Sequence, residues 1–134
     1  MENCVFCKIV KGEIPSDRTY EDENFLAFLT IGPVADGHLL VIPKKHLKDF
    51  IDLPDKIVSH LFIIIKKLSR ALRKACKPDA IEHISDDDIT NTGINIVRDH
   101  YKFHIIPRFR GDGIKHYWNR KGDKGIKFRI RYSK

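Results

Sequence analysis

The sequence has no long hydrophobic run. Its longest uninterrupted apolar segment extends only from Leu61 to Ile65, whereas a membrane-spanning helix needs about 20 apolar residues. The first residues, Met-Glu-Asn-Cys, lack the basic and then apolar segments of a signal peptide. The chain has only three cysteines, and an odd number does not suit a secreted domain held by disulfides. These absences exclude a membrane span and a disulfide framework, and we expect a cytoplasmic protein without membrane contact.

The composition suits one globular domain. The chain has 134 residues, of which 42% are hydrophobic and 32% charged, enough to bury a core without disulfide support. The net charge of +7 lies entirely in residues 110–134, which contain nine basic and two acidic residues, while the first 109 residues balance. We expect a domain over 1–112 and a basic extension over 113–134 that contains a strand, because apolar and basic residues alternate there. The extension is either a solvated surface or a site for RNA or another polyanion.

The first half of the chain predicts a short helix and a hairpin. A helix is expected from Val5 to Lys11, ended by Gly12. The segments 25–29 and 38–42 have the length and apolar content of strands, and a cluster of glycine, proline and aspartate between them favours a turn. These two segments are therefore predicted to form an antiparallel hairpin.

The second half predicts a long helix followed by strands. Proline at position 54 suits a first helical turn, apolar residues recur at helical spacing up to Ala75, and Lys77-Pro78 ends the pattern. Strands are expected at 94–97 and 100–108. The resulting fold class is α+β with an antiparallel sheet.

Two groups of residues carry chemistry. His100, Lys102 and His104 are spaced by two, so on a strand they share one polar face while Tyr101 and Phe103 point to the other.

Cys4 and Cys7 form a Cys-x-x-Cys pair, a spacing used for thiol redox chemistry and for zinc. Redox motifs usually follow a strand, and no strand precedes Cys4. Zinc needs two further ligands, for which His46 and His100 are candidates at the ends of predicted strands.

Four blocks of sequence resemble the histidine triad (HIT) superfamily, and most closely its Hint-like branch of bacteria and archaea. The blocks are Cys4-Val-Phe-Cys-Lys-Ile-Val-Lys-Gly-Glu-Ile-Pro15, Tyr20-Glu-Asp-Glu-Asn-Phe-Leu-Ala-Phe-Leu29, Gly37-His-Leu-Leu-Val-Ile-Pro-Lys-Lys-His46 and His104-Ile-Ile-Pro-Arg108. The resemblance covers roughly residues 4–112 in the family's order. It implies a five-stranded antiparallel sheet with one long helix, a homodimer and a pocket for a purine nucleotide.

The resemblance also implies a mechanism and a set of site residues. The middle histidine of a His-x-His-x-His motif attacks the α-phosphate of a nucleoside phosphoramidate or dinucleotide, and water then hydrolyses the nucleotidyl-histidine. The implied structural zinc ligands are Cys4, Cys7, His46 and His100, and the implied catalytic positions are Lys102 and His104. The implied nucleotide-binding positions are Val5, Phe6, Ile9, Phe28, Thr30, Ile31 and Asn95.

The sequence departs from the family where the chemistry takes place. Lys102 stands at the nucleophile position, and its amine has a reference pKa of about 10.4 against about 6.5 for imidazole. Thr30 stands where the family has an Asp for the ribose hydroxyls. The phosphate-binding stretch before the triad reads Ile94-Asn95-Ile96-Val97, without its glutamine and hydroxyl donors.

These departures leave three hypotheses. The first is a purine nucleotide-binding protein with weak or no hydrolysis. The second is an active nucleotide hydrolase or nucleotidyl transferase that uses Lys102 or His104. The third is a zinc-stabilised assembly protein with a nucleic-acid-binding tail.

Overall fold

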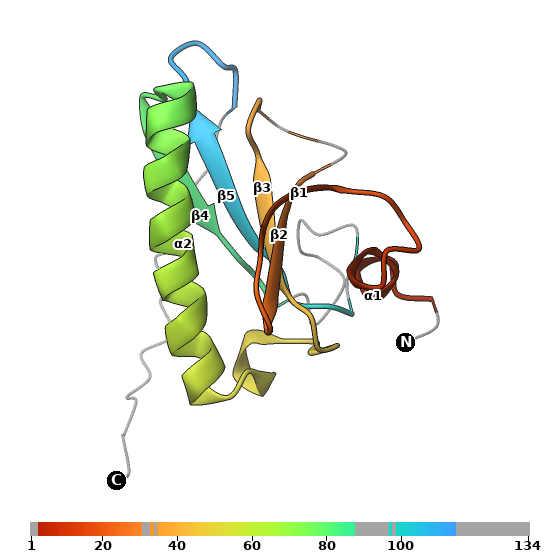
Figure 1. Cartoon of the computed structure of the whole chain (residues 1–134). Helices are drawn as coiled ribbons and strands as arrows, with labels where there is room; N and C mark the ends of the chain where they lie inside the picture. Colours follow the sequence, from red (N-terminus) through yellow and green to blue (C-terminus); the bar gives the residue numbers. More distant parts are fainter. Residues whose placement is uncertain (1–2, 31–32, 34, 88–96, 98, 115–134) are drawn as a thin grey trace, which may run out of the picture.

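The described residues fold into a five-stranded antiparallel sheet with a helix on each face (Figure 1). A computed structural model describes residues 3–30, 33, 35–87, 97 and 99–114. The elements are α1 (Val5–Val10), β1 (Asp17–Glu21), β2 (Phe25–Leu29), β3 (Leu39–Pro43), the 3-10 turn η1 (Phe50–Asp52), α2 (Asp55–Cys76), β4 (Ala80–Ile84) and β5 (Phe103–Arg108). The strand order is β1-β2-β3-β5-β4, which confirms the predicted α+β class and the HIT-type sheet.

Strands β2 and β3 lie inside the sheet and are buried on both faces, which explains why their sequences are almost continuously apolar. Side chains of one parity pack with α2 in a core that includes Phe25, Val41 and Ile105. Those of the other parity pack with α1 in a smaller core that includes Phe28 and Ile42. The sheet therefore has an α2 face and an α1 face with different partners.

The long helix α2 begins and ends as its sequence predicts. Pro54 precedes its first residue, and Lys77 ends it in the left-handed conformation, with φ of 48°. Its side chains Leu61, Ile64 and Leu68 lie in the larger core, as the helical spacing requires. No described helix is both long and apolar enough to cross a membrane.

Several predicted boundaries need correction. The strand expected from His100 begins only at Phe103, and the strand expected at His38 begins at Leu39. The edge strands β1 and β4 were not predicted from the pattern of residues, because both are largely polar or exposed. Of the strand expected at 94–97, only Val97 is described, and it lies in no strand. The strand expected in the basic extension falls in residues 115–134, outside the described part of the chain.

Candidate functional site

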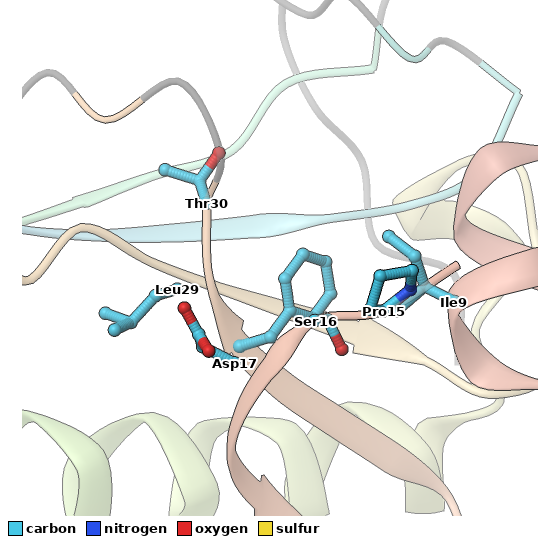
Figure 2. A pocket seen from close by; sticks show the side chains of 7 residues that line it. Ile9, Pro15, Ser16, Asp17, Leu29 and Thr30 are labelled. Atoms are coloured by element: carbon cyan, nitrogen blue, oxygen red, sulfur yellow. The ribbon is translucent and has the colours of Figure 1, made fainter. Parts of the chain in front are cut away.

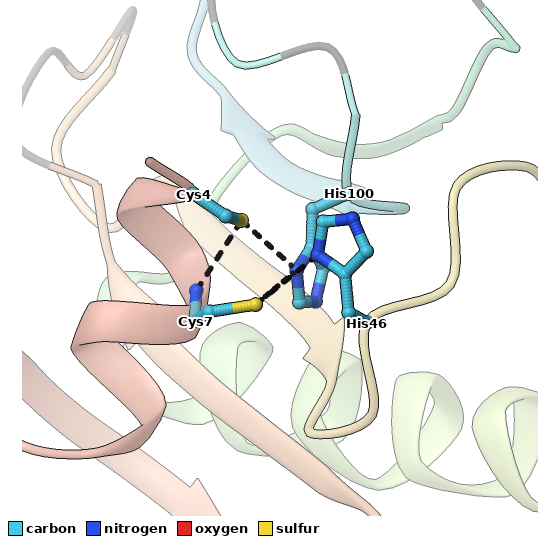
Figure 3. A group of neighbouring side chains, drawn as sticks. All are labelled: Cys4, Cys7, His46 and His100. Carbon is cyan, nitrogen blue, oxygen red and sulfur yellow. Dashed lines mark hydrogen bonds between the residues drawn. The ribbon is translucent and has the colours of Figure 1, made fainter. Parts of the chain in front are cut away.

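The α1 face of the sheet brings together a cysteine–histidine cluster, the histidine pair His38–His104 with Lys102, and part of a cavity. The cluster contains Cys4 at the start of α1 and Cys7 one turn later, so both sulfurs lie on the same side of the helix. His46 follows β3, and His100 precedes β5 (Figure 3). The four ligand atoms, two Sγ and two Nδ1, lie within 4.8 Å of one another.

The distances within this cluster fit a tetrahedral metal site. His46 Nδ1 lies 3.1 Å from Cys7 Sγ, and His100 Nδ1 lies 3.3 Å from Cys4 Sγ and 3.6 Å from Cys7 Sγ. In a tetrahedral zinc centre, bond lengths of about 2.3 Å to sulfur and 2.0–2.1 Å to nitrogen separate sulfur from nitrogen by about 3.6 Å. The donor set of two thiols and two imidazoles therefore suits zinc.

Hydrogen bonding prepares His100 to act as a ligand. Its Nε2–H donates to the carbonyl oxygen of Pro43 at 2.8 Å, so the Nδ1 lone pair faces the two sulfurs. Burial, together with the charges of His46 and Lys102, outweighs the Pro43 bond and lowers the pKa of His100 to about 4. The ring is therefore neutral at pH 7, the form that ligates metals. Burial and the adjacent Cys4 raise the pKa of the Cys7 thiol to about 11, so without a cation this cluster does not stabilise a thiolate.

Lys102 and His104 lie on the same face as α1, as their spacing predicts. Lys102 is 5% exposed, and its Nζ lies 5.7 Å from the centre of the Phe6 ring, within the range of a cation–π contact. Tyr101 and Phe103, on the alternate positions, are buried in the α2 core. The predicted division between a polar row and an apolar row is therefore confirmed, although the row is strand only from Phe103 onward.

His104 has a buried partner that the sequence pattern did not reveal. His38 Nε2 lies 2.9 Å from His104 Nδ1, and His38 is 5% exposed. Sequence reasoning placed His38 in an apolar strand and gave it no role. A usable signal existed, because His38 has the same parity as Leu40, which lies directly opposite His104 in the sheet.

Both of these histidines are held neutral at pH 7. Burial is the main cause for each, and the charges of His38 and Lys102 help to lower the pKa of His104 to about 4. Burial alone lowers the pKa of His38. The contact between the two rings is therefore an N–H of one donating to a lone pair of the other.

A cavity of about 300 Å³ lies beside α1, where β1 begins and β2 ends (Figure 2). Ile9 and Phe28 reach it from the α1 face, whereas the paired residues Asp17 and Leu29 have the parity of the α2 face. Phe28 in its wall is opposite Leu40, which is opposite His104. Two strand spacings, about 9.6 Å in total, therefore separate the cavity from His104 along the same face. That span is comparable to the reach from base to phosphate in a nucleotide. The cavity is lined by Ile9, Pro15, Ser16, Asp17, Phe28, Leu29 and Thr30.

The structure gathers only part of the predicted nucleotide-binding set. Ile9, Phe28 and Thr30 line the cavity. Phe6 is buried against Phe28, with ring centres 5.9 Å apart, whereas Val5 is exposed on α1 and does not line the cavity. Ile31 and Asn95 lie outside the described residues. The cavity is also lined by two polar residues, Ser16 and Asp17, that the sequence did not identify as site residues.

Comparison with known proteins places the chain in a family. The family model described as "HIT domain" matches residues 11–111. The protein hit of Bacillus subtilis is 42% identical over 125 residues, which cover 91% of this chain and 83% of that protein. The adenosine 5'-monophosphoramidase HNT1 of Candida albicans is 38% identical over 108 residues, or 79% of this chain and 70% of that protein.

A solved structure of another histidine triad protein supports the same family assignment. The zinc-bound histidine triad family protein of Mycobacterium smegmatis superposes with a TM-score of 0.74 at 35% identity, covering 89% of this chain and 84% of that one. The matched region contains the whole sheet, α2 and the His100–His104 row. On the evidence of the sequence match and the shared fold, this chain belongs to the HIT family.

Proposed function

We propose that this protein binds a purine nucleotide or nucleoside phosphoramidate on the α1 face and hydrolyses it weakly or not at all. A relative named as an adenosine 5'-monophosphoramidase supports the ligand class. The cavity beside Phe28 would take the base, and the phosphate would lie near Lys102 and His104. The observation that carries the proposal is Lys102, which is buried between His100 and His104, where the family's mechanism needs an attacking imidazole.

The chemistry of the amine explains the expected loss of turnover. When an imidazole attacks phosphorus, the bond to the leaving group breaks, and the imidazole itself then leaves readily as water attacks. An alkylamine that makes the same attack becomes a phosphoramidate whose nitrogen leaves poorly. A lysine at this position can therefore hold a phosphate by charge and hydrogen bonds, but it does not support the second half of the reaction.

The alternative of an active hydrolase depends on Lys102 or His104. An activating base works best with a pKa near the working pH, and the pKa of His104 is lowered to about 4. The structure therefore favours His104 as a hydrogen-bond donor to phosphate rather than as a base that activates water. A covalent role for Lys102 predicts a nucleotidyl adduct, which intact-mass analysis after incubation with a dinucleotide would detect.

The test of the main proposal compares the natural protein with a Lys102→His variant. Adenosine 5'-phosphoramidate is the substrate, and a His83→Gln variant on the opposite side of the sheet is the control. We expect the Lys102→His protein to turn over at least about 100-fold faster than the natural protein, and AMP to bind both in calorimetry. Turnover by the natural protein that is well above background and equal to that of Lys102→His would contradict the loss of hydrolysis, and absence of AMP binding to the natural protein would contradict the binding role.

We also propose that zinc occupies the cluster of Cys4, Cys7, His46 and His100. The geometry and the His100 tautomer support this assignment. The ion would be structural, because four protein ligands leave no open position for substrate, and it would connect α1 to the segments before β5 and after β3. Metal analysis of the purified protein should find one zinc per chain, and a Cys4→Ser variant should lose it.

We further propose that two copies of the chain pair through α2. Phe62 and Ile63 are exposed on this helix, and within the described residues β4 has a neighbouring strand on one side only. Between α2 and the strands β4 and β5 lies a groove of about 560 Å³. Sedimentation should show a dimer that Ile63→Glu weakens, whereas Ile51→Glu, an exposed isoleucine on η1, should leave it unchanged.

A further inference from the structure

Within the described part of the chain, the hydroxyl of Ser16 has no hydrogen-bond partner. Among the described residues, its Oγ is the one buried side-chain nitrogen or oxygen without a hydrogen bond. Buried polar groups are paired in almost all native proteins, because leaving one unpaired is destabilising. The Ser16 Oγ itself is out of reach of solvent, whereas other atoms of this residue line the cavity. A ligand in the cavity can therefore supply the missing partner only once the hydroxyl turns toward it.

The backbone around Ser16 is held in place while its hydroxyl can turn. The carbonyl oxygen of Ser16 accepts a hydrogen bond from the N–H of Arg18 at 3.1 Å. The Arg18 guanidinium in turn donates to the carbonyl oxygen of Ile9 at 2.7 Å, at the end of α1. These bonds keep β1 and α1 on either side of the cavity. The Ser16 Oγ moves by rotation about a single bond between staggered positions, so it can meet a ligand without any change in the backbone.

The walls of the cavity suit a flat heterocycle. Ile9, Pro15 and Phe28 are apolar and can cover the faces of a ring, whereas Ser16 and Asp17 are polar (Figure 2). The volume of about 300 Å³ is at the small end of the range for sites that bind small molecules. A purine ring has nitrogen acceptors on its edge, and a serine hydroxyl can donate to one of them. The carboxylate of Asp17 only accepts, so it cannot replace that bond.

We propose that Ser16 is a specificity-determining residue that donates a hydrogen bond to a ring nitrogen of the purine base. This inference rests on the proposed nucleotide-binding function and names the group that reads the base. It implies that the contribution of Ser16 to affinity depends on that ring nitrogen and is absent for a ligand that has no base.

The test measures the binding of AMP, its 1-deaza, 3-deaza and 7-deaza analogues, and ribose 5-phosphate to the natural protein and to Ser16→Ala. We expect AMP to bind Ser16→Ala about 3- to 10-fold more weakly, the range for one neutral hydrogen bond. One deaza analogue should bind the natural protein more weakly by the same factor, and Ser16→Ala should bind that analogue as well as it binds AMP. Ribose 5-phosphate should bind both proteins equally.

The controls separate this inference from the function on which it rests. Ser69→Ala removes a hydroxyl on α2 that is bonded to His83 at 2.8 Å, and it should not change AMP binding. If the natural protein and Ser16→Ala bind AMP equally, this inference is wrong and the nucleotide-binding function stands. If the natural protein binds none of the nucleotides, the proposed function fails and the inference fails with it. A higher melting temperature of Ser16→Ala with unchanged affinities would identify the hydroxyl as an unpaired group without a ligand.

Discussion

The two faces of the sheet are held by different forces. On the α2 face, a helix of 22 residues buries a continuous apolar core, whose stability comes mainly from area removed from water. On the α1 face, a helix of six residues is too short to be stable by itself. It is held by the cysteine–histidine cluster, by the bond from Arg18 to Ile9 and by a smaller apolar cluster.

The difference between the two faces concerns where the fold can accommodate buried polar groups. Buried polar groups such as His38, His100 and Lys102 occur on the α1 face, where each needs a specific partner. The α2 core supplies the stability that these groups do not. An apolar layer on one side of the sheet therefore supports a layer with several buried polar groups on the other.

Loss of the proposed zinc ion should reveal the largest difference between the two faces. Cys4→Ser, or a strong chelator, is expected to lower the free energy of unfolding by about 4 kcal/mol, as loss of a structural metal typically does. AMP affinity should fall as well, because α1 carries Ile9, which lines the cavity. Urea unfolding, metal analysis and calorimetry measure these effects. Cys76→Ser is the control, since this cysteine packs against the α2 core, and a stability loss equal to that of Cys4→Ser would contradict the assignment.

Truncation of the α2 core should lower stability without removing the metal. Leu61 is fully buried, and Leu61→Ala is expected to lower the free energy of unfolding by about 3 kcal/mol through lost burial and a cavity. Metal content and AMP affinity of the folded protein should be unchanged. If Leu61→Ala also loses zinc under native conditions, the two faces are not independent in the way proposed.

Acid should act first through the histidines of the α1 face. The folded pKa of His104 is lowered to about 4, below its unfolded value of about 6.5. Between these values the unfolded chain binds a proton that the folded chain does not, so stability is complete above pH 6.5 and falls toward pH 4. The contribution is about 1 kcal/mol per pH unit. Urea midpoints from pH 7 to 4.5 should fall less steeply for His104→Gln than for the natural protein, and equal slopes would contradict this origin of the acid sensitivity.

A smaller acid effect is expected on the α2 face, at a lower pH. Burial alone would raise the pKa of Asp22, but hydrogen bonds from Tyr20, His60 and two backbone N–H groups lower it to about 2. This contribution is present above pH 4 and is lost as the pH falls through about 2. Because the carboxylate is partly exposed, we expect Asp22→Asn to cost about 1 kcal/mol at pH 7. The difference from the natural protein should vanish near pH 2, and a difference that persists there would indicate another cause.

Much of the fold follows from local patterns. The spacing of apolar residues in α2 and the apolar content of β2 and β3 identify elements that are buried whatever their neighbours are. The edge strands β1 and β4 carry exposed polar side chains, and they become strands because a neighbour offers hydrogen-bonding groups. That neighbour is known only once the chain has folded.

The spacing and type of residues were enough to predict the alternating polar and apolar positions from His100 onward, the long helix and the Cys4–Cys7 pair, whereas the set of four metal ligands is what the resemblance to the HIT family implies. The packing of the sheet and the helices, by contrast, brings His38 to His104, places His100 before β5 so that it faces Cys4 and Cys7, and puts Ser16 beside a cavity. The contacts of His38 with His104 and of His100 with Cys4 join segments that are distant in the sequence. Ser16 lies closer in sequence to its neighbours, because α1 and β2 close the cavity beside it. Pairing across such distances depends on how the sheet and the two helices pack together, and residue periodicity carries no record of it.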